Sequence, residues 1–227
     1  MTRIFVTSIA QAHRSPYFAR ACVALFSTFW LIASAAHGAN APSLPAAFVK
    51  WAESQSEARD IRVPFRLTRT LATLKEPIIE SGIFWRFADG RFRWQLGTPP
   101  ISILSFDTVS LKSWDKSEDK WTTLDPKDRR SRLWMGFLDG KNLADSQLDK
   151  EFSVTVNGES ETSTNISLIP KSSAARKHLK QVDITIQAKE NRLLILRVLQ
   201  ADDASVQMDF AAPEQPSAED QSLVQKP

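Results

Sequence analysis

Apolar and polar residues alternate along most of the chain between residues 61 and 210. The segment IRVPFRLTRTL, residues 61–71, places Ile61, Val63, Phe65 and Leu67 on one face and charged residues on the other. Because successive side chains of a strand point to opposite faces, this pattern predicts half-buried β-strands. Similar runs separated by turn residues predict about ten short antiparallel strands. We therefore expect a mainly β (α+β) fold with a single, strongly curved antiparallel sheet.

Two segments break the alternation and predict helices against the concave side of this sheet. PSLPAAFVKWAESQSEARD, residues 42–60, carries Phe48, Trp51 and Ala52 at helical spacing. A second helix is predicted to begin at Asp125-Pro126, because Asp is a good N-cap and Pro suits the first helical position. Its apolar stripe, which is our candidate for a movable cover, consists of Trp134, Phe137 and Leu138.

The segment SGIFWRFADGRFRWQL, residues 81–96, predicts a β-hairpin with Asp89-Gly90 as a two-residue turn. The resulting register puts six apolar residues on one face, as the pairs Phe87–Phe92, Trp85–Trp94 and Ile83–Leu96. The opposite face pairs Arg86 with Arg93. We expect the aromatic face to point into the concave side and the arginine face to point outward.

Two interpretations of the aromatic face are open: ordinary core beneath a helix, or the wall of a slot for an apolar ligand. Six of the seven tryptophans lie beyond residue 38, which favours the slot. The candidate residues for binding an acyl chain are Phe65, Ile83, Trp85, Phe87, Phe92, Trp94, Leu96, Trp134, Phe137 and Leu138. The arginines Arg86, Arg91 and Arg93 form either a solvated outer face or a docking patch for a membrane-bound donor or anionic headgroups.

Residues 1–38 have the order of a secretory signal peptide: basic residues without acids, the apolar run ACVALFSTFWLIAS, then small residues. An uncleaved membrane anchor is the alternative, although the run is shorter than the roughly 20 residues of a spanning helix. The chain has 29 Lys and Arg against 26 Asp and Glu, and three of the arginines lie in this segment. The rest is balanced in charge, which gives no indication of nucleic-acid binding. We expect one domain over residues 39–211 and, from its composition, a disordered tail over residues 212–227.

Few residues of the remaining chain suit catalysis. Cys22 lies in the predicted signal peptide, and His178 is the only histidine beyond residue 38. His178 stands in the polar stretch ARKHLK, which is typical of a solvated histidine rather than of a triad or a zinc site. The acids gather in turns such as DKSED, so a glycosidase-type carboxylate pair is the one enzymatic alternative. We predict a protein that is not an enzyme and needs no cofactor or metal.

The order of several motifs resembles the periplasmic outer-membrane lipoprotein carriers (LolA-like proteins), over roughly residues 45–210. The first half matches in Ser81-Gly82, Phe92-Arg93-Trp94, Pro99-Pro100, Asp107 and Trp114-Asp115. The second half matches in FSVTVNG, ISLIPKSSAARKHLKQ and the closing strands. Many members carry Arg-Pro in the turn before the aromatic-x-Trp strand, where this chain has Ala88-Asp89. That arginine matters for cargo transfer in the family, so the resemblance leaves the cargo open.

The resemblance implies an unclosed half-barrel lidded by helices, whose apolar cavity takes the acyl chains of lipoproteins. It implies a periplasmic carrier, exported by a cleaved signal peptide, that receives cargo from an inner-membrane ABC exporter and passes it to an outer-membrane acceptor. The alternative is a related periplasmic protein that binds another lipid or glycolipid, or that senses lipid as a regulator. We expect a monomer.

Overall fold

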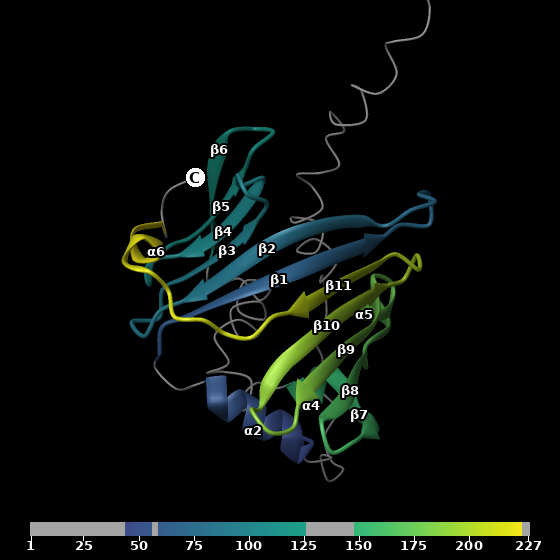
Figure 1. The fold of residues 1–227 in the computed structure, drawn as a ribbon. Coiled ribbons are helices and arrows are strands. Elements are labelled where there is room, and N and C mark those ends of the chain that lie inside the picture. Colours follow the sequence, from purple (N-terminus) through teal and green to yellow (C-terminus); the bar gives the residue numbers. More distant parts are fainter. Residues whose placement is uncertain (1–43, 56–58, 126–147, 224–227) are drawn as a thin grey trace, which may run out of the picture.

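The computed structural model describes residues 44–55, 59–125 and 148–223. Its centre is one antiparallel sheet of eleven strands, accompanied by a few short helices (Figure 1). The first six strands are β1 (Ile61–Thr70), β2 (Ile78–Arg86), β3 (Phe92–Leu96), β4 (Ser102–Phe106), β5 (Leu111–Asp115) and β6 (Lys120–Leu124). The other five are β7 (Phe152–Glu159), β8 (Ser163–Pro170), β9 (Leu179–Gln187), β10 (Arg192–Gln200) and β11 (Ser205–Phe210). The expected mainly β fold is confirmed.

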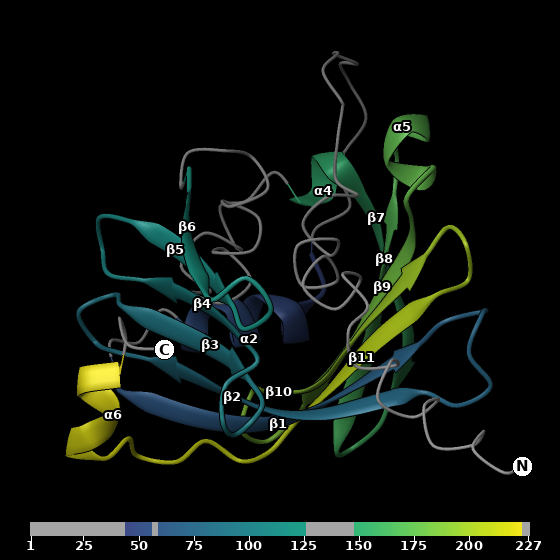
Figure 2. The same ribbon diagram turned by 90° about the horizontal axis from the view of Figure 1, so that it is seen from above.

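Two meanders, β1 to β6 and β7 to β11, make up the sheet, and the pairing of β1 with β11 joins them. Strands β6 and β7 form the two edges, and no ladder between them exists in the part of the chain that the structure describes. The sheet curves around an inner face, with helix α2 (Ala46–Gln55) inside the curve and helix α6 (Ala218–Ser222) outside it (Figure 2). The fold is therefore an unclosed half-barrel, as expected.

The inner face holds the main core. Along β1, the residues predicted from the alternation, Ile61, Val63, Phe65 and Leu67, are all buried. They cluster with Phe48, Trp51 and Ala52 of α2, which is the predicted N-terminal helix. Two further helices are short: α4 (Leu148–Glu151) precedes β7, and α5 (Ser173–Arg176) precedes β9.

The predicted register of the β2–β3 hairpin is wrong by one residue. The structure pairs Phe84 with Trp94 and Trp85 with Arg93. The cause lies in the turn, because only Gly90 has a positive φ, of 90°, whereas a type I′ turn needs positive φ at both central positions. The backbone N–H of Phe87 donates to the carbonyl oxygen of Arg91 at 2.9 Å around a three-residue loop, and the N–H of Gly90 donates to the carbonyl oxygen of Phe87 at 2.9 Å.

A slip of one residue moves one strand's side chains to the opposite face of the sheet. Ile83, Trp85 and Phe87 therefore lie on the outer face, while Phe92, Trp94 and Leu96 stay on the inner face as predicted. Arg86, predicted to point outward, instead shares the inner face and is only 4% exposed.

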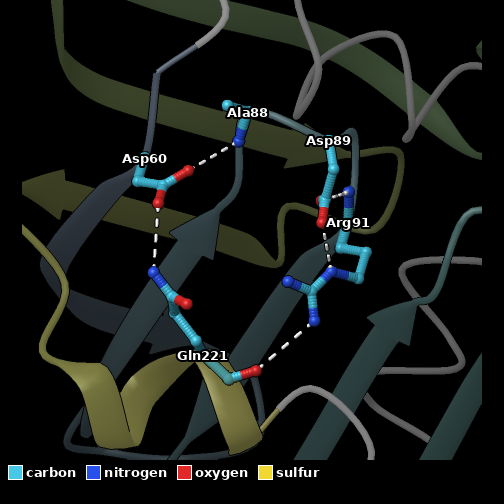
Figure 3. Close-up of polar contacts among 5 residues, drawn as sticks. All are labelled: Asp60, Ala88, Asp89, Arg91 and Gln221. Atoms are coloured by element: carbon cyan, nitrogen blue, oxygen red, sulfur yellow. Dashed lines mark hydrogen bonds and ion pairs between the residues drawn. The ribbon is translucent and has the colours of Figure 1, made fainter.

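The segment after β11 is not the disordered tail that its composition predicted. Glu214 pairs with Arg62 at the start of β1 through two backbone hydrogen bonds of 2.9 and 2.7 Å. Helix α6 begins at a capping box formed by Ser217 and Asp220. Gln221 in α6 donates to Asp60 and accepts from Arg91 in the β2–β3 loop, at 3.4 Å each (Figure 3). Specific polar contacts thus hold this segment against the hairpin.

Below α6, Ile83, Trp85, Phe87 and Leu223 form a second apolar cluster, the outer aromatic cluster. Trp85 donates from Nε1 to Asp220 of α6 at 2.9 Å. The helix therefore removes from water the aromatic residues that the register slip placed outside. The predicted signal peptide (1–38) and the predicted cover residues Trp134, Phe137 and Leu138 lie outside the described residues.

Candidate functional site

A cavity of about 350 Å³ lies inside the curve of the sheet, beside α2. Most of its lining is apolar and comes from α2, β1, β2, β3, β10, β11 and the segment that follows: Trp51, Ile61, Val63, Phe84, Trp94, Leu193, Leu196, Phe210, Ala211 and Pro213. The remaining lining residues are polar and come from the segment before β1, the β9–β10 turn and the start of β10: Arg59, Glu190, Asn191 and Arg192. The site is therefore an apolar cavity with charged residues at one side.

The long-range pairing of β1 with β11 creates this site. Phe65 pairs with Phe210, and β10 follows β11 in the sheet. Residues near 61 and residues near 196 and 210 thus meet on one inner face, although about 135 to 150 residues separate them in the chain. Local alternation indicates which residues are buried, but only this pairing shows that they line one cavity.

Stacked aromatic rings form the wall beside the cavity. The rings of Phe65 and Trp94 lie 4.1 Å apart between centroids, inclined by 33°, and Phe84 lies 6.2 Å from Trp94. This arrangement needs Gly82, the register partner of Phe65. A Cβ at residue 82 would lie 2.1 Å from Cζ of Phe65, so the Phe65 ring occupies the space above a missing side chain. Because residue 82 has no side chain, the Phe65 ring can lie against the Trp94 ring.

Helix α2 lies beside the cavity, and a hydrogen bond joins its end to the β9–β10 turn. Phe48 and Trp51 are buried and meet edge to face, with centroids 5.4 Å apart. Ser54 donates a hydrogen bond of 3.2 Å to the backbone oxygen of Asn191 in the β9–β10 turn. Asn191 has a φ of 46°, which Asn tolerates better than most residues. The end of α2 thus sits over the polar side of the cavity.

The charged residues of this polar side are exposed or form ion pairs. Arg192 lies 3.3 Å from Glu190 and donates to Gln187 at 2.9 Å. Arg59 is exposed. An amphiphile with its chain in the cavity would therefore meet guanidinium groups and a carboxylate where its polar end leaves the protein.

The structure separates the predicted acyl-chain residues into three groups. Trp94 lines the cavity, and Phe65, Phe92 and Leu96 lie on the same inner face without lining it. Ile83, Trp85 and Phe87 lie on the opposite face in the outer aromatic cluster. The sequence analysis missed as site residues those that β10 and β11 contribute, Leu193, Leu196 and Phe210, and treated Trp51 only as helix core. No local sequence signal distinguishes Trp51 from the core residues of the same helix.

The three predicted docking arginines do not form one patch. Arg86 is on the inner face, and Arg93 is on the outer face but only 2% exposed. Arg93 donates to Gln95 Oε1 at 2.8 and 3.2 Å and to the backbone oxygen of Leu223. Burial lowers the pKa of the Arg93 guanidinium to about 10. Arg91 alone is half-buried at the surface, where it pairs with Asp89 at 2.7 Å (Figure 3). Its guanidinium lies over the Phe87 ring.

Within residues 44–55, 59–125 and 148–223, no three His, Cys, Asp or Glu side chains gather as a metal site would require. In the same ranges, every helix is too short or too polar for a transmembrane span.

The fold and the cavity are those of a LolA-like half-barrel. The model of the outer membrane lipoprotein carrier protein LolA matches residues 56–225, about three quarters of the chain, and the protein belongs to this family. The match includes the segment that carries α6. No curated protein matches the sequence significantly.

Solved structures resemble the chain at low identity. A DUF1329 family protein from Desulfovibrio piger is 8% identical, with 79% of this chain and 95% of that chain covered and a TM-score of 0.43. A LolA superfamily protein from Nitrosomonas europaea is also 8% identical, with coverage of 79% and 96% and a TM-score of 0.39. The MucA/MucB complex of Pseudomonas aeruginosa gives 14% identity, coverage of 77% and 60%, and a TM-score of 0.40. Similarity at this level carries no information on function.

Proposed function

We propose that the protein is a periplasmic carrier that shelters the acyl chains of lipoproteins in the cavity beside α2. The observation that carries this proposal is the apolar lining of that cavity in a chain of the LolA family. The volume of about 350 Å³ falls within the range of small-molecule sites, near its lower end. Apolar side chains with charged residues on one side suit an amphiphile, whose chain is buried and whose head stays in water.

The size of the cavity favours a carrier over a permanent store. Each buried methylene contributes about 0.8 kcal/mol, so about eight methylenes would contribute about 6 kcal/mol before the cost of association. Even if this whole amount appeared as binding free energy, the affinity would be weaker than micromolar, so cargo can leave when an acceptor covers its chains. Within this proposal, an inner-membrane ABC exporter supplies the cargo, an outer-membrane acceptor takes it, and no catalytic step occurs.

The alternative cargo is another lipid or glycolipid, and it uses the same cavity. The polar side with Arg59, Glu190 and Arg192 supports this alternative equally well, because its charges suit any anionic or zwitterionic head. The bound species therefore has to be identified directly.

Native mass spectrometry of the protein purified without detergent from a periplasmic extract tests the proposal. We expect a bound mass that matches an acylated species, and we expect Trp94→Glu to lose it, because the substitution places a carboxylate in the cavity wall. Ile79→Glu is the matched control, since Ile79 on β2 is 51% exposed and outside the cavity lining. Leu193→Trp, which fills the cavity with apolar atoms, covers the case in which Trp94→Glu does not fold. A ligand-free mass that takes up no added lipopeptide would refute the proposal.

A further inference from the structure

The segment that follows β11, residues 211–223, contacts both faces of the sheet, and we call it the C-terminal strap. Ala211 and Pro213 near its start line the cavity, and because both are exposed they stand at the rim of the opening. Near its end, Asp220 accepts a hydrogen bond from the outer aromatic cluster, into which Leu223 packs. The strap therefore joins the rim of the cavity to the opposite face of the sheet.

A short segment at the start of β1 both lines the cavity and holds the strap. Its odd-numbered residues from 59 to 63 line the cavity. Its even-numbered residues hold the strap: Arg62 forms an ion pair and two backbone hydrogen bonds with Glu214, and Asp60 accepts from Gln221 at 3.4 Å (Figure 3). Because successive side chains of a strand point to opposite faces, the strap and the cavity depend on the same few residues.

The contacts that hold the strap are of a kind that opens easily. None of the residues of α6 is buried, and its two contacts through Gln221 are long, at 3.4 Å each. In the ion pair with Arg62, the side chain of Glu214 is 55% exposed. Segments with little buried apolar surface and solvent-exposed hydrogen bonds open locally at a free energy well below that of global unfolding. The strap therefore has two accessible states, closed as in the structure and open.

A ligand in the cavity distinguishes these two states. An apolar chain there contacts Ala211 and Pro213 only while the strap is closed, because the open strap takes both residues away from the rim. A ligand shifts a two-state equilibrium toward the state in which it makes more favourable contacts. Such coupling is reciprocal, so opening the strap must weaken the binding of the ligand by the same factor by which the ligand favours closure.

We propose that the C-terminal strap is a latch: cargo in the cavity closes it, and lifting α6 from the outer aromatic cluster weakens the hold on the cargo. This inference rests on the proposed function, because it requires a ligand in the cavity. It adds a release step that acts at the outer face of the sheet, without entry of another molecule into the cavity. If one or two methylene groups lose their cover at the rim, the affinity falls about four- to fifteenfold.

Hydrogen exchange of the protein expressed from its full coding sequence tests the latch in the wild type. The ligand is lauroyl lysophosphatidylcholine, kept below its critical micelle concentration. It should slow exchange at the N–H groups of α6 and at the backbone N–H of Glu214, which donates to Arg62, by up to about fifteenfold. The backbone N–H of Ser110, which donates to Asp107 in the β4–β5 turn, is the internal control and should exchange at an unchanged rate.

Asp220→Lys tests the reciprocal effect. It removes the acceptor of Trp85 Nε1 and places an ammonium group on the helix that Arg91 and Arg93 hold, so it should open the strap. Calorimetric titration should then show an affinity for the same lipid that is about four- to fifteenfold lower, although residue 220 does not line the cavity. Glu118→Lys is the matched control, because it makes the same change of charge at an exposed residue of the β5–β6 turn, and its affinity should equal that of the wild type.

The possible results separate the latch from the carrier function on which it rests. Binding of the lipid without slower exchange in the strap would overturn the latch and leave the carrier proposal intact. Wild-type affinity in an Asp220→Lys protein whose strap exchanges faster would do the same. Absence of binding would overturn both. If Asp220→Lys does not fold, or leaves exchange in the strap unchanged, the exchange measurement on the wild type decides.

Discussion

Gly82→Ala is a small substitution that should have a large effect. In a strand, replacing Gly by Ala normally stabilises by about 0.4–1 kcal/mol, because the unfolded chain loses freedom. At residue 82 the new Cβ would lie 2.1 and 2.5 Å from the Phe65 ring and 2.7 Å from the backbone oxygen of Gln95. The ring and the backbone of β3 must therefore shift.

The cost of this overpacking can be bounded. Forcing one methyl group into a filled core typically costs about 1–3 kcal/mol, and the backbone contact with Gln95 places residue 82 in the upper part of that range. After the gain from the unfolded state is deducted, we expect a net loss of about 2 kcal/mol. For a domain of this size, that corresponds to a fall in Tm of about 4–8 °C. Because Phe65 supports Trp94, affinity for an acyl chain should fall as well.

Thermal denaturation of a double-mutant cycle with Phe65→Leu measures the effect. The smaller side chain relieves the contacts with the ring, so Gly82→Ala should cost at least about 1 kcal/mol less in the Phe65→Leu background. Gly158→Ala on β7 is the control, because its Cβ would meet only Asn165 Nδ2 at 3.7 Å, and we expect it to be neutral or stabilising. Additive effects to within about 0.5 kcal/mol, or a Gly82→Ala protein as stable as Gly158→Ala, would refute the reasoning.

Three further predictions concern the outer face and one turn. Asp220→Ala should cost about 1 kcal/mol in chemical denaturation, and less in a Trp85→Phe background, because both remove the same hydrogen bond. Arg93→Lys should lower Tm by several degrees and increase protease cleavage after β11, since an ammonium cannot reproduce the guanidinium bonds to Gln95 and Leu223. Hydrogen bonds, first of all from the backbone N–H of Ser110, hold the pKa of Asp107 below its usual range. Its ionised form thus stabilises the fold above about pH 4 and stops doing so as pH falls through the lowered pKa, so Asp107→Asn should be less stable at pH 7 and no less stable near pH 2 in urea titrations.

Short sequence patterns predicted those parts of the fold in which a few neighbouring residues determine the local structure. Alternation identified β1, because Ile61, Val63, Phe65 and Leu67 stand at every second position and are buried on one face. Asp107, which accepts from the backbone N–H of Val109 and Ser110, marked the turn between β4 and β5. Trp114 and Trp121 flank the next turn, DKSEDK, and they are register partners. In each case the local structure follows from residues that are close together in the sequence.

The cavity could not be predicted in the same way. Leu193 and Phe210 are apolar residues in ordinary strands, and nothing near them in sequence shows that they meet Trp94. That contact depends on β1 pairing with β11, a choice made by the whole chain rather than by a short segment.

The two errors in the prediction have one physical origin. In the run Ile83-Phe84-Trp85-Arg86-Phe87, one face is fully apolar and the other carries Phe84 and Arg86. The face with Arg86 is the inner one, so alternation alone indicates the wrong face here. Register is then decided by what each face can be packed against. If residues 212–227 were disordered, as their composition predicts, the outer face would have no cover and aromatic residues on it would be exposed to water. The capping box at Ser217 was the missed signal, because a helix there supplies Asp220 and Leu223 to cover Trp85, and with that cover the register seen in the structure buries aromatic residues on both sides of the sheet.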